Sequence, residues 1–160
     1  MLVHARDMQL VVFKLDLQRY ALHLPIVERI VPLVEITPLP QAPPIVLGVI
    51  NVQGRVIPVV DIRQRFRLPE RASLLSDRLV LARSADRTLA LLVDAVIGVV
   101  DCSQSSWAVP DQIHPGLEYL QGVVSLDDGL ILIHDIDTFL SSSEGRSLQE
   151  AMQQPPGALQ

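Results

Sequence analysis

The 160-residue sequence has few aromatic residues, a single cysteine and no run of basic residues. Aromatic residues make up 4% of the chain, which disfavours an aromatic-lined pocket for a small molecule. The one cysteine, Cys102, excludes an internal disulfide and is typical of a reducing compartment. A net charge of −5 without any basic run argues against binding to nucleic acid.

Long apolar runs are also missing. No stretch approaches the length that spans a membrane, and the N-terminal MLVHARDMQL lacks the apolar core of a signal peptide. We therefore predict a cytoplasmic protein without direct membrane insertion. What the chain does contain is 49% hydrophobic residues, mostly Val, Ile and Leu, which favour strands and supply a buried core.

The stretch Gly48–Phe66 predicts a β-hairpin that ends in a short helical turn. Two apolar runs flank the turn Gln53-Gly54-Arg55. Asp61 suits the N-cap of the helical piece that follows, because its carboxylate accepts from free N–H groups. Pro58 removes a hydrogen-bond donor from the second run, which predicts an edge or bulged strand. An edge hairpin would display its main chain and side chains to a partner.

A second hairpin, Gly122–Leu140, matches Gly48–Phe66 without a gap at an offset of 74 residues, and Asp61 then falls on Asp135. Upstream, Tyr20–Leu24 matches Leu89–Val93 at an offset of 69 residues. Insertions that change the offset are tolerated in loops. The pattern therefore predicts an internal duplication.

From this duplication we predict a mainly β fold: two small five-stranded β-barrel subdomains around a shared hydrophobic core, with short helical turns. The predicted domain covers residues 8–140, with subdomains at roughly 15–82 and 83–140 between which terminal strands can be exchanged. Residues 141–160 are rich in Ser, Gln and Pro, which predicts a mobile tail.

The residue types that enzymes use for catalysis are scattered along the chain. The four histidines have no metal-ligand spacing to other ligands, and the isolated glycines form no phosphate-binding loop. The one dense His-Asp patch, His134–Asp137, is better explained as a strand end followed by a helix start. We predict no enzymatic activity, no catalytic residue, no cofactor and no metal site.

A specific pattern runs through the first hairpin, where residues Gly48 to Asp61 have the form G-V-I-N-x-x-G-x-x-I-P-V-x-D. Further parts of the pattern are Phe13, Tyr20–Leu22, Val27–Ile30, Pro40, Leu91–Asp94, Val96, Ile113, Gly122-Val123 and Leu130–Asp135. Together they cover about Met8 to Leu140. This pattern resembles the CheW family, the coupling proteins of bacterial chemosensory arrays.

The resemblance implies two small β-barrels around a shared core and a non-catalytic adaptor in chemotaxis or related signal transduction. The implied partners are the hairpin tip of a methyl-accepting chemoreceptor and the regulatory domain of a CheA-type histidine kinase. The protein would then associate with membrane-anchored receptor arrays only through these partners. The candidate partner-binding residues are Val27, Glu28, Arg29, Ile30, Gly48, Gln53, Gly54, Arg55, Ile57 and Pro58.

The sequence departs from the family pattern at two candidate positions. The family usually has N-L-R-G in the hairpin turn, whereas Gln53 replaces the arginine here and Arg55 lies two positions on. The family also tends to have V-x-E-I, whereas Arg29 stands at the glutamate position and Glu28 beside it. Arginine offers a fixed cation and a fork of donors that glutamine lacks. Three explanations fit: charges exchanged for a particular partner, a divergent CheW-like protein of a surface-motility or other non-flagellar pathway, or drift at an exposed loop.

Other classes of protein stay open at this point. A fragment related to the kinase's own regulatory domain is one, although no ATP-binding or phosphorylatable-His segment is present. A small-molecule-binding β-barrel is disfavoured by the low aromatic content. A hydrolytic enzyme built on Cys102 or His134 is the weakest, because a nucleophile needs a partner that the sequence does not indicate.

Overall fold

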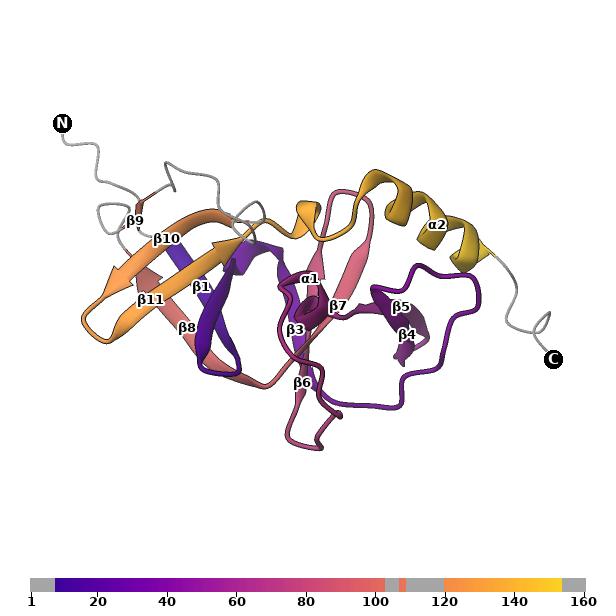
Figure 1. Cartoon of the computed structure of the whole chain (residues 1–160), viewed down its shortest axis with the longest axis horizontal. Helices are drawn as coiled ribbons and strands as arrows, with labels where there is room; N and C mark the ends of the chain where they lie inside the picture. The colour runs from indigo at the N-terminus through magenta and orange to yellow at the C-terminus, as the bar shows by residue number, and fades with distance from the viewer. Residues whose placement is uncertain (1–7, 103–106, 109–119, 154–160) are drawn as a thin grey trace.

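The computed structural model describes residues 8–102, 107–108 and 120–153, and its strands form two sheets that lie side by side (Figure 1). In chain order the elements are β1 (Met8–Leu15), β2 (Gln18–His23), η1 (Leu24–Ile26), β3 (Val27–Pro32), β4 (Val46–Val52), β5 (Arg55–Val60), α1 (Ile62–Arg65), β6 (Arg78–Arg83), β7 (Thr88–Val93), β8 (Ala95–Cys102), β9 (Trp107–Ala108), β10 (Leu120–Leu126), β11 (Gly129–His134), η3 (Ile136–Thr138) and α2 (Ser142–Gln153). No helix in these ranges is long and apolar enough to cross a membrane.

Sheet A has the strand order β8-β1-β2-β11-β10-β9, and sheet B has the order β3-β6-β7-β5-β4. Both sheets are mixed, because β11 runs parallel to β2 and β5 runs parallel to β7. All strands of sheet B lie within residues 27–93, and the strands of sheet A come from before and after that segment. In the described ranges no ladder joins the two edge strands of either sheet. The predicted mainly β fold is confirmed.

The hairpins β4–β5 and β10–β11 pair in the same register, which confirms the internal duplication. Gly48 lies opposite Val59 and Gly122 opposite Ile133, each beside a bulge. The parallel pairs agree as well: Val59 pairs with Ala90 in sheet B, and Ile133 pairs with Ala21 in sheet A.

The two predicted N-caps are also present. An Asp61 carboxylate oxygen accepts from the Gln64 backbone N–H at 3.2 Å. Asp135 accepts from the backbone N–H of Asp137 at 3.0 Å. Each carboxylate satisfies a donor that the first helical turn leaves unpaired.

A second bulge is repeated in the edge strands β3 and β8. Against β6, Glu28 is the extra residue between Val27 and Arg29. Against β1, Ile97 is the extra residue between Val96 and Gly98. Glu28 and Ile97 therefore occupy equivalent positions at an offset of 69 residues, although one is charged and the other apolar.

Alternate residues of the strands point to opposite faces, so each sheet has an inner face of its own and a second face toward the other sheet. The inner face of sheet B is lined by Ile50, Ile57, Val59, Leu79, Leu81 and Ala90. Their equivalents in sheet A are Val124, Ile131, Ile133, Leu10, Val12 and Ala21. The shared core between the sheets contains, among others, Phe13, Leu15, Leu22, Val60, Val80, Leu91, Ile136, Phe139 and Leu148.

Pro58 marks neither an edge strand nor a bulge in β5, because it pairs regularly with Val49 and the bulge of this hairpin lies in β4, so the prediction of an edge or bulged strand is wrong. The strand lies between β7 and β4, and β4 forms the edge. Pro58 is tolerated because the parallel ladder with β7 includes only Val59 and Val60, so no bond to β7 is needed where the proline stands.

Helix α2 occupies most of the stretch for which the sequence predicted a mobile tail. Leu148 is fully buried in the shared core, and Ala151 is 2% exposed. The helix is tied to α1 by an ion pair of 2.6 Å between Arg65 and Glu144. Burial of these side chains explains why a polar segment is ordered here.

Candidate partner-binding site

The curl of sheet B brings four of the candidate residues together at one end of the sheet. Glu28 and Arg29 come from β3, Gln53 comes from the turn between β4 and β5, and Arg55 is the first residue of β5. With Val52 and Leu81 they line a pocket of about 290 Å³, which we call the sheet B pocket. Because β3 and β4 are the opposite edges of the sheet, this meeting depends on the sheet bending round on itself.

A closed ring of hydrogen bonds joins Glu28, Arg55 and Thr88 across this end. Arg55 Nη1 donates to Glu28 Oε2 at 3.2 Å, and Arg55 Nη2 donates to Thr88 Oγ1 at 3.1 Å. Thr88 Oγ1 in turn donates to Glu28 Oε1 at 2.9 Å. The ring fixes the hairpin turn against the edge strand β3 and orients both charged side chains.

The ring changes the acidity of Glu28. Partial burial alone would raise the pKa of its carboxyl, but the bonds from Thr88 and Arg55 and the attraction of Arg83 outweigh burial. The pKa of Glu28 therefore lies below its ordinary value, and the carboxylate is ionised at neutral pH.

The other two pocket candidates are presented outward. Gln53 is exposed, with φ of 52°, and Gly54 beside it has φ of 87°, so the turn requires a glycine there. Asn51 Oδ1 accepts from the Gly54 N–H at 2.9 Å and holds this turn. Arg29 is exposed on β3, and within the described ranges its guanidinium has no ion pair.

The remaining candidates serve different parts of the fold. Ile30 is 41% exposed on β3, and Val27 packs partly against the shared core. Ile57 and Pro58 are buried in β5. Gly48 is buried too: a Cβ there would lie 2.3 Å from the carbonyl oxygen of Thr37, so no side chain fits.

Thr88 and Arg83 belong to this site, but the sequence alone did not identify them. They lie at the β7 start and the β6 end, and their place is set by the pairing of β6 with β3 and β7. Neither residue stands in a local motif. Only the approximate repeat of Tyr20–Leu24 in Leu89–Val93 indicated where these strands would lie.

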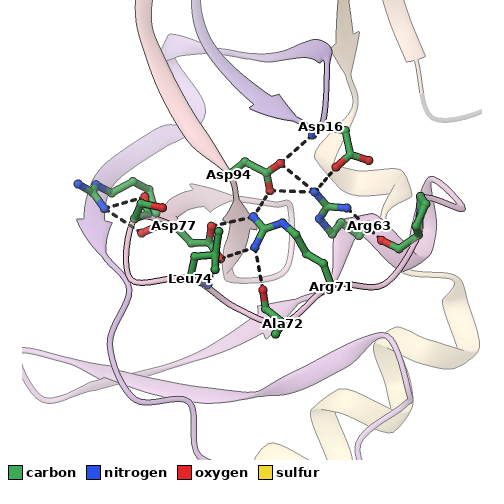
Figure 2. Close-up of polar contacts among 10 residues, drawn as sticks. Asp16, Arg63, Arg71, Ala72, Leu74, Asp77 and Asp94 are labelled. Carbon is green, nitrogen blue, oxygen red and sulfur yellow. Dashed lines mark hydrogen bonds and ion pairs between the residues drawn. The ribbon is translucent and has the colours of Figure 1, made fainter.

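A second polar cluster lies where the chain passes from sheet B to sheet A (Figure 2). Asp94, between β7 and β8, accepts from Arg63 Nη2 at 2.8 Å, from Arg71 and from the Asp16 backbone N–H at 2.7 Å. Arg63 also bonds Asp16 at 2.6 Å, and Arg71 bonds Asp77 at 2.7 Å. The cluster joins the β1–β2 turn, α1 and the segment 68–77 to one carboxylate.

This cluster also lowers the pKa of Asp94. Burial raises it, but the backbone bond from Asp16 and the bonds from Arg63 and Arg71 outweigh burial, so the pKa lies below its usual value. Beside the cluster is a cleft of about 540 Å³, whose lining includes the apolar side chains of Leu47 and Leu92.

Comparison with known proteins gives a consistent result along the chain. The family model described as CheW-like domain matches residues 9–144. A chemotaxis protein CheW of Treponema pallidum is 30% identical over 154 residues, which cover 92% of this chain and 91% of that protein. A chemotaxis protein CheW of Rhizobium meliloti is 28% identical over 138 residues, covering 85% and 89%.

A solved structure agrees with these sequence matches. The crystal structure of the scaffolding protein TtCheW from Thermoanaerobacter tengcongensis superposes with a TM-score of 0.80 at 27% identity. The superposition covers 87% of this chain and 96% of that one. The similarity in sequence and in structure therefore extends over nearly all of the described residues.

Proposed function

The chain belongs to the family of CheW-like domains, and we propose that it couples the hairpin tip of a chemoreceptor to the regulatory domain of a CheA-type histidine kinase. Its relatives are chemotaxis and scaffolding proteins, and the chain is a non-catalytic adaptor of chemosensory signalling. The family match over residues 9–144 is the observation that carries this conclusion.

For the receptor we propose the cleft beside the Asp94 cluster. A helical hairpin docks by an apolar face, and this cleft offers Leu47 and Leu92 with charged groups around them. Leu47 is 38% exposed on the edge strand β4, so a helix can reach it without rearrangement of the sheet.

For the kinase we propose the sheet B pocket with Arg29 and Gln53 at its rim. The hydrogen-bonded ring of Glu28, Arg55 and Thr88 supports this choice, because it holds charged groups in fixed positions at the surface. A fixed arrangement of charges loses little side-chain entropy when a partner binds.

Binding measurements with the cognate partners test the function. The full chain is titrated with the kinase regulatory domain and, separately, with the receptor tip, and binding to both is expected. Leu47→Asp should weaken receptor binding about tenfold or more, because it places a charge in an apolar contact. Leu75→Asp is the matched control, since Leu75 is 93% exposed and lies outside the cleft lining. Failure of the wild-type chain to bind either partner would refute the proposal.

A further inference from the structure

Arginines gather at the sheet B pocket although the chain as a whole carries a net charge of −5. An adjoining pocket of about 180 Å³ shares Arg55 with it and lies against the β6–β7 turn. The two carboxylates that line these pockets are Glu28 and Asp86. The four arginines, which we call the arginine surface, are Arg29, Arg55, Arg83 and Arg87.

Within the described part of the chain, only one of the four arginines forms an ion pair. Arg55 is paired with Glu28. Arg29 and Arg83 are exposed, and neither has an ion pair within the described ranges. Guanidinium groups of this kind bind carboxylates through two parallel hydrogen bonds. The surface can therefore accept negative groups from outside.

The backbone holds these arginines in place. Arg29 follows the bulge at Glu28 and lies opposite Leu81 on β6, and Arg83 ends that same strand. Arg55 starts β5 and is fixed by its bonds to Glu28 and Thr88. Because strands rather than a loop position three of the four arginines, their spacing is set before a partner arrives.

We propose that the arginine surface binds a cluster of carboxylates on the regulatory domain of the kinase. This inference rests on the proposed function and specifies the chemistry of one partner. Arginines outnumber carboxylates in the lining of these two pockets, whereas carboxylates outnumber arginines in the Leu47 cleft, so a partner with negative groups fits the arginine surface better. The apolar face of the receptor's helical hairpin can instead contact Leu47 and Leu92 in that cleft. Charge complementarity of this kind raises the association rate and excludes partners with a basic patch.

The test compares two double charge reversals in the full-length chain. Arg29→Glu with Arg83→Glu should weaken binding of the cognate kinase regulatory domain at least about tenfold at about 50 mM NaCl, because like charges would then face each other. Wild-type binding should weaken on going to about 300 mM NaCl, and binding of the double variant should depend much less on salt. The neutral pair Arg29→Gln with Arg83→Gln should lie between them.

The matched control is Arg67→Glu with Arg146→Glu. Both arginines are exposed, lie outside the two pockets and have no ion pair in the described part of the chain, so the variant makes the same change in net charge elsewhere. Its kinase binding should stay within about twofold of wild type. Receptor-tip binding should be unchanged in both double variants, and equal melting temperatures would show that both fold.

Three results would overturn the proposal. Equal kinase binding by the reversal and the control would leave the proposed function standing without a role for these arginines. If the Arg29→Glu/Arg83→Glu variant kept kinase binding but lost binding to the receptor tip, or to phosphatidylserine vesicles, the surface would belong to that other partner. If the wild-type chain binds neither kinase domain nor receptor tip, the proposed function and this inference fail together.

Discussion

Glu28 and Ile97 stand at equivalent bulges in the two sheets. One residue is charged and the other is apolar, and the residues around them differ as well. Glu28 lies in a ring with Arg55 and Thr88. Ile97 is 49% exposed, and the residue equivalent to Arg55 is Gly129. At the corresponding end of sheet A, Arg19 and Asp128 form an ion pair of 3.0 Å.

The two sheets thus share the backbone arrangement at these bulges, but the side chains at the surface differ. All six inner residues of sheet B have apolar counterparts in sheet A, because close packing constrains them. The bulge residues point to solvent, where packing imposes no such constraint. Packing therefore fixes the residue type in the interior of both sheets, whereas the residues at the sheet ends differ between them.

The largest expected effect comes from adding a side chain at Gly48, where sheet B leaves no room for one. Gly48 and Gly98 have similar positive φ angles, 154° and 143°, but a Cβ would meet the Thr37 carbonyl only at Gly48 and open space at Gly98. We expect Gly48→Ala to lower the free energy of unfolding by about 4 kcal/mol and Gly98→Ala by about 1 kcal/mol. Urea unfolding of the two variants measures the difference. Equal losses would mean that the clash at Gly48 relaxes.

The next effect concerns α2, which follows the second hairpin and has no counterpart after the first. Leu148→Ala should cost about 3 kcal/mol of unfolding free energy, because it leaves a cavity in the shared core. Gln149→Ala, at an exposed position of the same helix, should cost under about 0.5 kcal/mol. Thermal unfolding distinguishes them, and a small loss for Leu148→Ala would show that the core closes without the helix.

The chain crosses between the two sheets twice, between β2 and β3 and between β7 and β8. Asp94 lies at the second crossing, and the equivalent residue at the first is Pro25. Substitution of Asp94 therefore tests how the two crossings differ. Asp94→Asn should cost about 2 kcal/mol, because it leaves Arg63 and Arg71 without their shared carboxylate. Asp101→Asn on β8 is the control, as Asp101 is exposed and makes no ion pair in the described ranges.

The stability difference between wild type and Asp94→Asn should also depend on pH. The pKa of Asp94 is lowered by folding, so its stabilising contribution is complete above the unfolded-state pKa of about 3.9 and is lost as the pH falls through the lower native value. The difference in stability between wild type and Asp94→Asn should therefore be constant near neutrality and shrink below about pH 4. A difference that grows on acidification would contradict this sign.

The smallest effects are expected from substitutions at the two bulge residues, Glu28 and Ile97. Glu28→Gln should cost about 0.5 kcal/mol, because Arg55 is largely exposed and the ion pair is screened by water. Ile97→Gln introduces the same residue at the equivalent position and should change stability by less than that. About 1 M salt should reduce the cost of Glu28→Gln and leave Ile97→Gln unchanged, as chemical denaturation with urea can measure.

The duplication and the hairpins could be predicted because their signals are local. Inner residues such as Ile50 and Val124 must be apolar and regularly spaced, and the caps Asp61 and Asp135 stand next to the turns that they serve. The meeting of Glu28 with Arg55 and Thr88 could not be predicted in this way. It depends on how far sheet B curls, and curl results from many pairings between distant segments.

Helix α2 had a local signal that the composition of the tail concealed. Ser141 and Glu144 form a capping box, in which Ser141 Oγ accepts from the Glu144 N–H at 3.1 Å and Glu144 Oε1 accepts from the Ser141 N–H at 2.8 Å. Leu148, Ala151 and Met152 then follow at helical spacing. Few apolar residues were needed, because the shared core already supplied the surface that they cover.

The arrangement of the strands along the chain also sets an order for synthesis on the ribosome. Every strand of sheet B lies between residues 27 and 93, so that sheet can be complete before β8 exists. Among the described strands β1 and β2 are made before all others, but β1 finds its neighbour β8 only after residue 102 has emerged, and β2 finds β11 only after residue 134. Since domains tend to fold as their residues emerge, the segment inserted into sheet A is the one that can fold first. Among the described strands, β1 and β2 therefore wait longest for their partners, with their edges exposed to other chains.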